Sequence, residues 1–320
     1  MDRPGPVERL RAQVADFAAT RLPQARQCCV ALSGGPDSLA LTAAVAAVLP
    51  TTALIVDHGL QSDSAEVATA AHEQALALGC IAARVLTVRV GTDGGPEAAA
   101  RAARYAALEG AREGSPVLLA HTLDDQAETV LLGLGRGSGA RSIAGMRACD
   151  PPWYRPLLDV RRSTTLAVCA ELGLTAWDDP HNSDPRFTRV RLRREVLPLL
   201  EDVLNGGVAE ALARTAAALR EDTDALDALA EHHRVAAQSG AGLDIAVLRE
   251  LPVALRRRVI RGWLLTGGAV GLTDIQIRAV DALVTDWHGQ GGVAVGGGVP
   301  RTRLFAQRTG AVLTLRHEPV

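Results

Sequence analysis

The chain contains no lysine, so all 34 of its lysine-plus-arginine positive charges are arginine. This absence excludes a Walker-type phosphate loop, which needs a lysine followed by serine or threonine after its last glycine. It also excludes Schiff-base and pyridoxal chemistry, because both require a side-chain amine. Any covalent or acid–base role must therefore belong to other side chains.

Cysteine is scarce and irregularly placed. The chain has five cysteines, an odd number, and Cys28 and Cys29 are adjacent. Because no Cys-x-x-Cys pair is present, the sequence indicates neither a disulfide framework nor a zinc or iron–sulfur site. We expect buried thiols.

Features of membrane and secreted proteins are also missing. No apolar run approaches the roughly eighteen residues that a bilayer-spanning helix needs. The first residues, Met-Asp-Arg-Pro-Gly-Pro, lack the basic end and apolar stretch of a secretory signal. We therefore expect a cytoplasmic protein with no membrane partner.

A chain of 320 residues can form one large core and a smaller second unit. In the first half, short apolar strands alternate with helix-like stretches such as 64–78, a pattern typical of a parallel sheet with helices on both faces. The predicted strands are 28–32, 52–57, 82–90 and 116–120. The predicted class is α/β with a Rossmann-like sheet.

The pattern changes in the second half. We expect a polar loop at 176–185, an alternating tail at 291–315 that suits a small antiparallel sheet, and several helices, over 163–172, 188–204, 207–236, 252–266 and 273–286. These elements predict a first domain over 1–206, a connecting helix within 207–240 and a smaller α+β domain over 241–320.

The most informative segment is the glycine turn Ser33-Gly-Gly-Pro-Asp-Ser38, between the first strand and a helix. A strand that ends in such a turn presents backbone N–H groups and a positive helix end to an anion, so it predicts phosphate binding. The turn carries an acid, Asp37, which suggests Mg²⁺ between that carboxylate and the phosphates. The dinucleotide fingerprint G-x-G-x-x-G is absent here. The structural alternative is a turn whose serines only cap the helix.

Two further polar clusters follow predicted strands. Asp57 and His58 come after the second strand, and the segment His121–Glu128 comes after the fourth. Ligands of parallel sheets gather at the carboxyl ends of the strands, so these clusters should share one edge with the glycine turn.

The acids of 121–128 have a structural and a functional interpretation. Thr122 can cap the following helix with Asp125 as its capping-box partner, which needs no ligand. Glu128 remains unexplained, because it shares a helical face with Asp124 and Asp125. Three acids on one face repel one another, so we expect Mg²⁺ or a substrate ammonium among them.

His58 and His121 have no metal-ligand spacing to a second histidine or cysteine. We expect them to hydrogen-bond nucleotide or substrate, although a lone histidine after a strand is more often structural. Arg101 and Arg104 share a helical face and could clamp a phosphate or a carboxylate. The alternative for these arginines is a solvated helix face.

With a net charge of −2, the chain has no global basic field, so nucleic acid would have to bind a local patch. The segment 186–194 is such a patch, with five arginines in nine residues. They cannot all lie on one face of a helix. We expect some to reach the site and others to face RNA phosphates, against the alternative of an ordinary basic surface helix.

Taken together, these motifs resemble the tRNA(Ile)-lysidine synthetases of the PP-loop ATP pyrophosphatase group. The resemblance covers the first half and the basic segment, through Ser33-Gly-Gly-Pro-Asp-Ser38, Val56-Asp-His-Gly-Leu60, Arg101-Ala-Ala-Arg-Tyr105, His121-Thr-Leu-Asp-Asp-Gln-Ala-Glu-Thr129, Arg136-Gly-Ser-Gly139, Arg155-Pro-Leu-Leu158 and Asp178-Asp-Pro-His-Asn-Ser-Asp184. The first motif marks only the group. The fourth, with Arg-Gly-Ser-Gly and Asp-Asp-Pro, is specific to the lysidine enzymes.

The resemblance implies a reaction in which ATP with Mg²⁺ adenylates O2 of the wobble cytidine of an isoleucine tRNA with a CAU anticodon. Free L-lysine then displaces AMP. It implies the following sites: for ATP, Ser33, Gly34, Gly35, Pro36, Asp37, Ser38, Asp57, His58 and Arg104; for catalysis, Asp37, Arg101, His121, Asp125 and Glu128; for metal, Asp37 and Asp125; for lysine or tRNA, Asp124, Asp125, Glu128, Arg189, Arg191, Arg193 and Arg194. The C-terminal domain would bind tRNA, and the enzyme could be a homodimer.

The chain departs from the family pattern in two ways. It has no room for the additional C-terminal domain of the longer members, and Val190 replaces an asparagine common in their Arg-Asn-Arg stretch. Three alternatives remain: a tRNA thiolase of the same group, which would need cysteines; a small-molecule synthetase, which would not need the basic segment; and an ATP-binding module without catalysis, in which Asp125 and Glu128 would be dispensable.

Overall fold

The computed structural model describes residues 4–59, 63–91, 95–137, 139–179, 183–297 and 302–319. The chain forms two compact units. The first ends at Ala216, inside helix α10 (Val208–Ala236). The second contains the rest of α10 and everything after it, together with a short segment that ends at Arg141. In these ranges no helix is long and apolar enough to cross a membrane.

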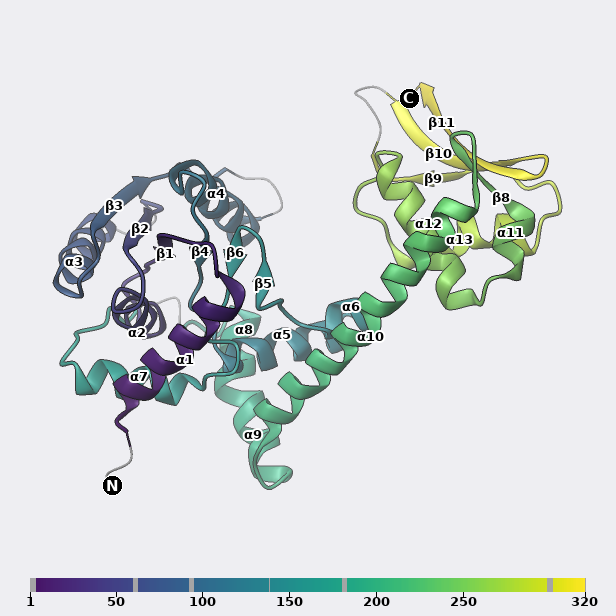
Figure 1. The fold of residues 1–320 in the computed structure, drawn as a ribbon. Coiled ribbons are helices and arrows are strands. Elements are labelled where there is room, and N and C mark those ends of the chain that lie inside the picture. Colours follow the sequence, from purple (N-terminus) through teal and green to yellow (C-terminus); the bar gives the residue numbers. More distant parts are fainter. Residues whose placement is uncertain are drawn as a thin grey trace. The chain divides into compact units, whose positions relative to one another are not determined.

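A six-stranded sheet, as far as the structure is described, forms the centre of the first unit, in the order β3-β2-β1-β4-β6-β5 (Figure 1). Its strands are β1 (Cys28–Ala31), β2 (Thr51–Asp57), β3 (Ala82–Thr87), β4 (Val117–Leu118), β5 (Cys149–Asp150) and β6 (Trp153–Tyr154). Only β5 is antiparallel to its neighbour. Because β1 lies between β2 and β4, the carboxyl ends of these three strands share one edge.

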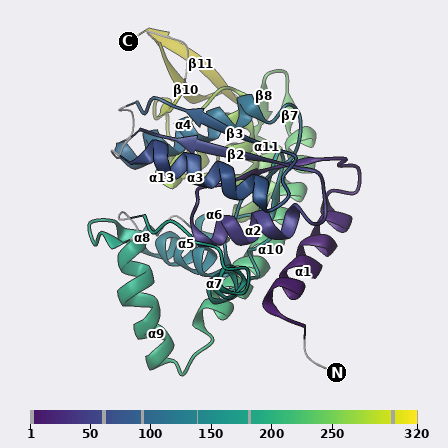
Figure 2. The same cartoon turned by 90° about the vertical axis from the view of Figure 1, so that its left-hand side faces the viewer.

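Helices cover both faces of this sheet, which confirms the predicted α/β class. Alternate residues of a strand point to opposite faces, and Val30 accordingly joins the larger core while Cys29 joins a smaller one with Leu108. Figures 1 and 2 show α2 and α3 on one side of the strands and α4 on the other. The larger core is formed with α1 (Pro6–Arg21), α2 (Pro36–Val45), α3 (Ser64–Ala77) and α7 (Arg162–Glu171), the smaller with α4 (Pro96–Ala111).

The structure corrects several predicted boundaries. The third strand ends at Thr87, and the fourth is confined to Val117–Leu118. Helix α1 was not predicted, although the buried residues Val7, Leu10 and Val14 have helical spacing that indicates it. Of the five thiols, Cys149 is partly buried and the other four are buried.

The basic segment is one helical run with an irregular middle. It begins as α8 (Thr188–Arg191), passes through a π-helical segment (Leu192–Val196) and continues as α9 (Leu197–Val203). Single π-turns in a helix are common near functional sites. The helix α5 (Leu123–Gly135), which carries the predicted acids, packs against this π-helical segment.

The second unit has its own core. An antiparallel sheet of order β7-β8-β11-β10-β9 packs with helices α11 (Ile245–Glu250), α12 (Val253–Thr266) and α13 (Asp274–Thr285). Its strands are β7 (Gln238–Ser239), β8 (Gly242–Asp244), β9 (Val293–Val295), β10 (Thr302–Thr309) and β11 (Val312–Pro319). The tail pattern predicted the last three strands, whereas β7 and β8 were missed. Buried Asp281 binds Arg256 and Arg257 there.

Candidate active site

The glycine turn is a closed loop at the start of α2. Gly34 has a φ of +81°, which a residue with a Cβ rarely adopts, and its carbonyl accepts a hydrogen bond from the Trp177 amide at 2.9 Å. The Ser38 hydroxyl accepts from the Ser33 amide at 3.2 Å and donates to the Gly35 carbonyl at 2.9 Å. Gly35 is the N-cap of α2, with Pro36 after it. The loop therefore presents a helix N-terminus at the edge of the sheet, which suits a phosphate.

Asp37 lies in the first turn of α2 and is held by α7. Its Oδ2 accepts a hydrogen bond from Arg162 Nε at 2.9 Å, and its Oδ1 accepts one from the Thr165 hydroxyl. Burial raises the pKa of Asp37, although the Arg162 guanidinium and the Thr165 hydroxyl act in the opposite direction.

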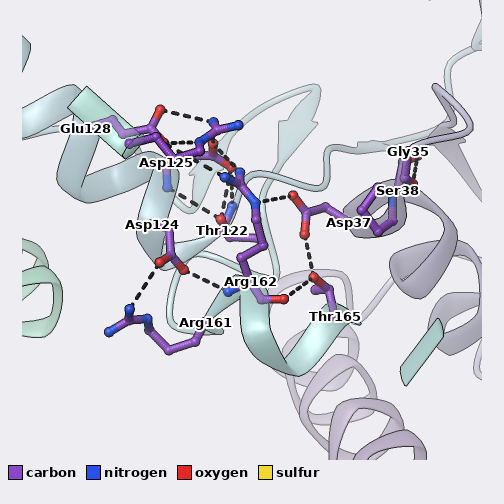
Figure 3. Close-up of polar contacts among 12 residues, drawn as sticks. Gly35, Asp37, Ser38, Thr122, Asp124, Asp125, Glu128, Arg161, Arg162 and Thr165 are labelled. Atoms are coloured by element: carbon purple, nitrogen blue, oxygen red, sulfur yellow. Dashed lines mark hydrogen bonds and ion pairs between the residues drawn. The ribbon is translucent and has the colours of Figure 1, made fainter. Parts of the chain in front are cut away.

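Arg162, which begins α7, joins the glycine turn to the acids of α5 (Figure 3). Its Nη2 donates to Asp125 Oδ1 at 2.7 Å, and its backbone amide donates to Asp124 Oδ2 at 2.7 Å. Its Nη1 lies 3.9 Å from Glu128 Oε1. A single guanidinium therefore lies among acids from two motifs that are far apart in the sequence.

Asp125 serves the helix cap and the charged cluster at the same time. Its Oδ2 accepts from the Thr122 amide at 2.9 Å and the Thr122 hydroxyl at 3.0 Å, which completes the predicted capping box. Its Oδ1 accepts from Arg162 and, at 3.2 Å, from Arg193 Nη2. Burial raises the pKa of Asp125, but Arg162 and the Thr122 amide outweigh it and the net shift is downward.

Glu128 is fully buried and paired with the basic segment. Its Oε1 accepts from Arg193 Nε at 2.6 Å, and Arg189 Nη1 lies 3.7 Å from Oε2. Burial raises the pKa of Glu128, and Arg193 opposes that shift. We call Asp37, Asp125, Glu128, Arg162 and Arg193 the acid–arginine cluster.

The prediction that Asp124, Asp125 and Glu128 form one group of acids is only partly correct. Asp125 and Glu128 belong to the cluster, but Asp124 turns to Arg161 Nη2, 3.2 Å away, and to the backbone of Arg162. The prediction that a metal or substrate must neutralise these acids overlooked the protein's own arginines. Arg161 and Arg162 lie three and four positions after the Arg155-Pro-Leu-Leu158 motif, at a helix start, and that position was the available signal.

The arginines of the basic segment divide into two groups, as the sequence predicted: some reach the site and others are exposed. Arg189 and Arg193 reach α5, where Arg189 also donates to the Thr129 hydroxyl at 3.3 Å. Arg191 is exposed and pairs with Glu195 at 2.9 Å, while exposed Arg194 donates to the Ser183 hydroxyl at 2.7 Å. Buried Val190, the residue that departs from the family pattern, belongs to the apolar interior.

The two predicted histidines present unused ring nitrogens. His58 Nδ1 and His121 Nδ1 are buried and have no hydrogen-bond partner in the described part of the chain. Burial lowers the pKa of both imidazoles, that of His121 to about 4. His121 is therefore neutral at physiological pH. An unpartnered buried nitrogen is costly, which suggests a ligand with complementary groups.

Arg101 and Arg104 are organised by an aromatic pair. The Tyr105 ring lies 4.9 Å from the Arg101 guanidinium and 5.6 Å from that of Arg104, and it packs edge-on against Trp153. Burial lowers the pKa of Arg104. Asp57, at the end of β2, accepts a hydrogen bond from the Gly59 amide at 2.9 Å.

Among the described residues, no three His, Cys, Asp or Glu side chains could hold a metal ion by themselves. Asp37 and Asp125 could supply two carboxylates, and Mg²⁺ in nucleotide sites usually needs no more than this because phosphate oxygens and water complete its shell. The donor set therefore fits Mg²⁺ delivered with a triphosphate. Three of the family motifs contain residues that lie outside the described ranges: Leu60, Ser138 and 180–182.

A parallel sheet with a glycine turn of this kind and an acid in the following helix defines the class of PP-loop ATP-binding proteins. Residues 6–200 match the PP-loop domain, and residues 243–309 match the TilS substrate binding domain. The chain resembles a U34-tRNA thiolase from Methanococcus maripaludis in fold, with a TM-score of 0.55, 17% identity and coverage of 68% of this chain and 80% of that one.

The sequence relatives identify the family more narrowly. The tRNA(Ile)-lysidine synthase of Mycolicibacterium paratuberculosis is 68% identical over 320 residues, and that of Mycobacterium tuberculosis H37Rv is 67% identical over 324, each alignment covering 100% of both chains. The Rhodococcus erythropolis enzyme is 62% identical over 92% of this chain and 90% of its own. The chain belongs to the tRNA(Ile)-lysidine synthase family, as its motifs predicted.

Proposed function

We propose that the protein is a ligase that joins L-lysine to C2 of the wobble cytidine in an isoleucine tRNA with a CAU anticodon, consuming ATP and releasing AMP and pyrophosphate. The observation that carries this proposal is the acid–arginine cluster, which links the acid of the phosphate turn to the acids of α5 in a chain of this family.

The proposed ATP site uses the backbone of Ser33–Ser38 for phosphate, with Asp57, His58 and Arg104 nearby at the same sheet edge. Mg²⁺ would be held by Asp37 and Asp125, where it would neutralise phosphate charge as a Lewis acid. Both carboxylates are partly buried, and each accepts a hydrogen bond from Arg162.

The chemistry we propose has two displacements. Cytidine O2 attacks the α-phosphorus of ATP, and the bond to pyrophosphate breaks. The ε-amine of lysine then attacks C2, the C2–O2 bond breaks, AMP leaves with that oxygen, and the nitrogen loses a proton. Arg101 and neutral His121 are proposed to stabilise charge during the first step, so catalysis is mainly positioning and electrostatics.

We propose that lysine and tRNA contact different parts of the site. Asp124, Asp125 and Glu128 would attract the lysine ammonium. Of the four arginines assigned to substrate, Arg189 and Arg193 already bind α5, so exposed Arg191 and Arg194 are better placed for RNA phosphates. The domain of 241–320 would bind more of the tRNA, with 1–206 as the catalytic domain and 207–240 as the connection. We also propose a cytoplasmic homodimer, which sedimentation can test.

The cysteines argue against the thiolase alternative. Burial raises the pKa of Cys29, Cys80 and Cys169 to about 11, so these thiols are protonated at neutral pH. A sulfur-transfer nucleophile requires the thiolate.

The deciding experiment is incubation of the protein with ATP, labelled lysine and total tRNA. We expect label in tRNA in an amount equal to the pyrophosphate released, and none when ATP is omitted or when the CAU anticodon is changed. Absence of label from tRNA would eliminate the proposed function. Labelling without ATP would contradict the adenylation step.

A further inference from the structure

Arg162 has more functional contacts than an ordinary ion-pair residue. Its guanidinium donates to Asp37 at 2.9 Å and to Asp125 at 2.7 Å, which are the two carboxylates proposed to hold the metal. The remaining nitrogen, Nη1, is buried and has no hydrogen-bond partner within the ranges that the structure describes; it lies 3.9 Å from Glu128. One donor of this cation is therefore left for an acceptor that the described residues do not supply.

Arg162 and a divalent cation would compete for the same carboxylates. Like charges a few ångströms apart repel each other strongly in a partly buried site, and the repulsion is larger for a divalent ion than for a monovalent one. A metal bound to Asp37 and Asp125 would therefore be repelled by the guanidinium unless negative charge arrived with it. Triphosphate brings that charge.

We propose that Arg162 is a positioning residue that occupies the metal's place in the nucleotide-free site, so that Mg²⁺ enters together with ATP and not alone. This inference rests on the proposed function. The planar guanidinium matches phosphate oxygens well, so ATP offers Arg162 replacement acceptors, including one for Nη1. Arg162 thereby holds Asp37 and Asp125 close together until the nucleotide arrives.

The proposal predicts a binding property that can be measured without catalysis. Without the guanidinium, Asp37 and Asp125 lose their main counter-charge and become a better site for a free divalent ion. The probe is Mn²⁺, followed by electron paramagnetic resonance with purified full-length protein in the absence of nucleotide.

The variant Arg162→Met should bind free Mn²⁺ about tenfold or more tighter than the wild type, because a repulsive charge has been removed. Arg112→Met is the matched control, since Arg112 also forms an ion pair at 2.8 Å and its side chain is 21% exposed against 20% for Arg162. This control should match the wild type. With a non-hydrolysable ATP analogue present, wild type and Arg162→Met should differ by less than about threefold. Equal free-Mn²⁺ affinity in wild type and Arg162→Met would overturn the role of Arg162.

A second variant protects the test against misfolding, which circular dichroism and thermal melting would reveal. Arg162→Lys keeps the charge but has a compact ammonium in place of a planar fork. Because it keeps the repulsive charge, it should bind free Mn²⁺ within about threefold of the wild type, and a gain as large as that of Arg162→Met would overturn the proposal. A wild type that binds no Mn²⁺ even with the ATP analogue would contradict the proposed ATP site itself. A wild type that binds it, with no gain in Arg162→Met, would refute only the inference on Arg162.

Discussion

At the scale of single residues, the site depends on how each buried carboxylate is neutralised. Asp37 and Glu128 have a raised pKa because of burial, yet each accepts a short hydrogen bond from an arginine. Removing one member of a buried ion pair leaves the other unpaired, which is costly. Changes at these positions should therefore act on both catalysis and local structure.

The first prediction concerns Asp37, whose substitution by Asn keeps the size but removes the charge. We expect Asp37→Asn to lower lysine incorporation by about a hundredfold or more, because the proposed site uses this carboxylate to hold the metal and because it pairs with Arg162. The matched control is Asp274→Asn, an exposed acid in the first turn of α13 that pairs with Arg278. Near-normal incorporation by Asp37→Asn in the labelled-lysine assay would refute the assigned role.

The second prediction follows from the lowered pKa of His121. An unfolded histidine titrates near 6.5, whereas the buried one titrates near 4, so between these values only the unfolded chain binds the proton. The contribution of His121 to stability is therefore constant above pH 6.5 and is lost progressively as the pH falls toward 4.

The variant His121→Gln removes this dependence. Between about pH 7.5 and about pH 5 its free energy of unfolding should fall less than that of the wild type, by about 1–2 kcal/mol. Urea unfolding at both pH values measures this difference, with exposed His232→Gln on α10 as the control. Parallel losses in wild type and His121→Gln would mean that His121 is not the buried neutral group described.

At the scale of secondary-structure elements, one capping box has a second use. In α5, one carboxylate oxygen of Asp125 accepts hydrogen bonds from the N-cap residue Thr122. The other oxygen accepts from Arg162 and Arg193. In α13, Thr273 and Gln276 form the same motif, with a neutral amide in place of the carboxylate. A comparison of the two helices can therefore separate the structural role of a capping box from its role in the site.

The third prediction uses this pair. Thr122→Ala and Thr273→Ala should each cost about 1 kcal/mol of folding free energy, because each removes a cap. Only Thr122→Ala should also lower lysine incorporation, since it frees Asp125 from its fixed orientation. Thermal unfolding and the labelled-lysine assay measure the two effects. A comparable loss of activity in Thr273→Ala, or none in Thr122→Ala, would contradict the double role of Asp125.

The sequence predicted those elements whose signals are local. The glycine turn, the capping box at Thr122 and the alternation of strands and helices all depend on residues within a few positions of one another. Arg162 could not be assigned in this way, because it lies 125 positions from Asp37 and only the folded sheet and α7 bring them together. The irregular middle of the basic segment was also missed; it packs against α5, which is distant in the sequence.

At the scale of the whole molecule, the chain has a net charge of −2 and must attract RNA through local charge. Arg189 and Arg193 already contact side chains of α5. The exposed arginines of the basic segment are the ones that we propose for RNA phosphates, and a phosphate contact releases counterions when it forms. Salt dependence therefore distinguishes an RNA contact from a structural one.

The fourth prediction is that Arg191→Ala and Arg194→Ala each weaken tRNA binding, by about three- to tenfold at low salt, and each reduce the slope of log affinity against log salt by about one. Arg84→Ala is the control, because Arg84 is 44% exposed and paired with Glu113, much as Arg191 is 60% exposed and paired with Glu195. Filter binding at several salt concentrations gives both quantities. Because these arginines are proposed to hold RNA without touching the reacting atoms, KM for tRNA should rise while kcat stays close to that of the wild type. An unchanged salt slope in both variants would mean that the basic segment is an ordinary surface helix. A fall in kcat alone would mean that these arginines take part in the reaction itself.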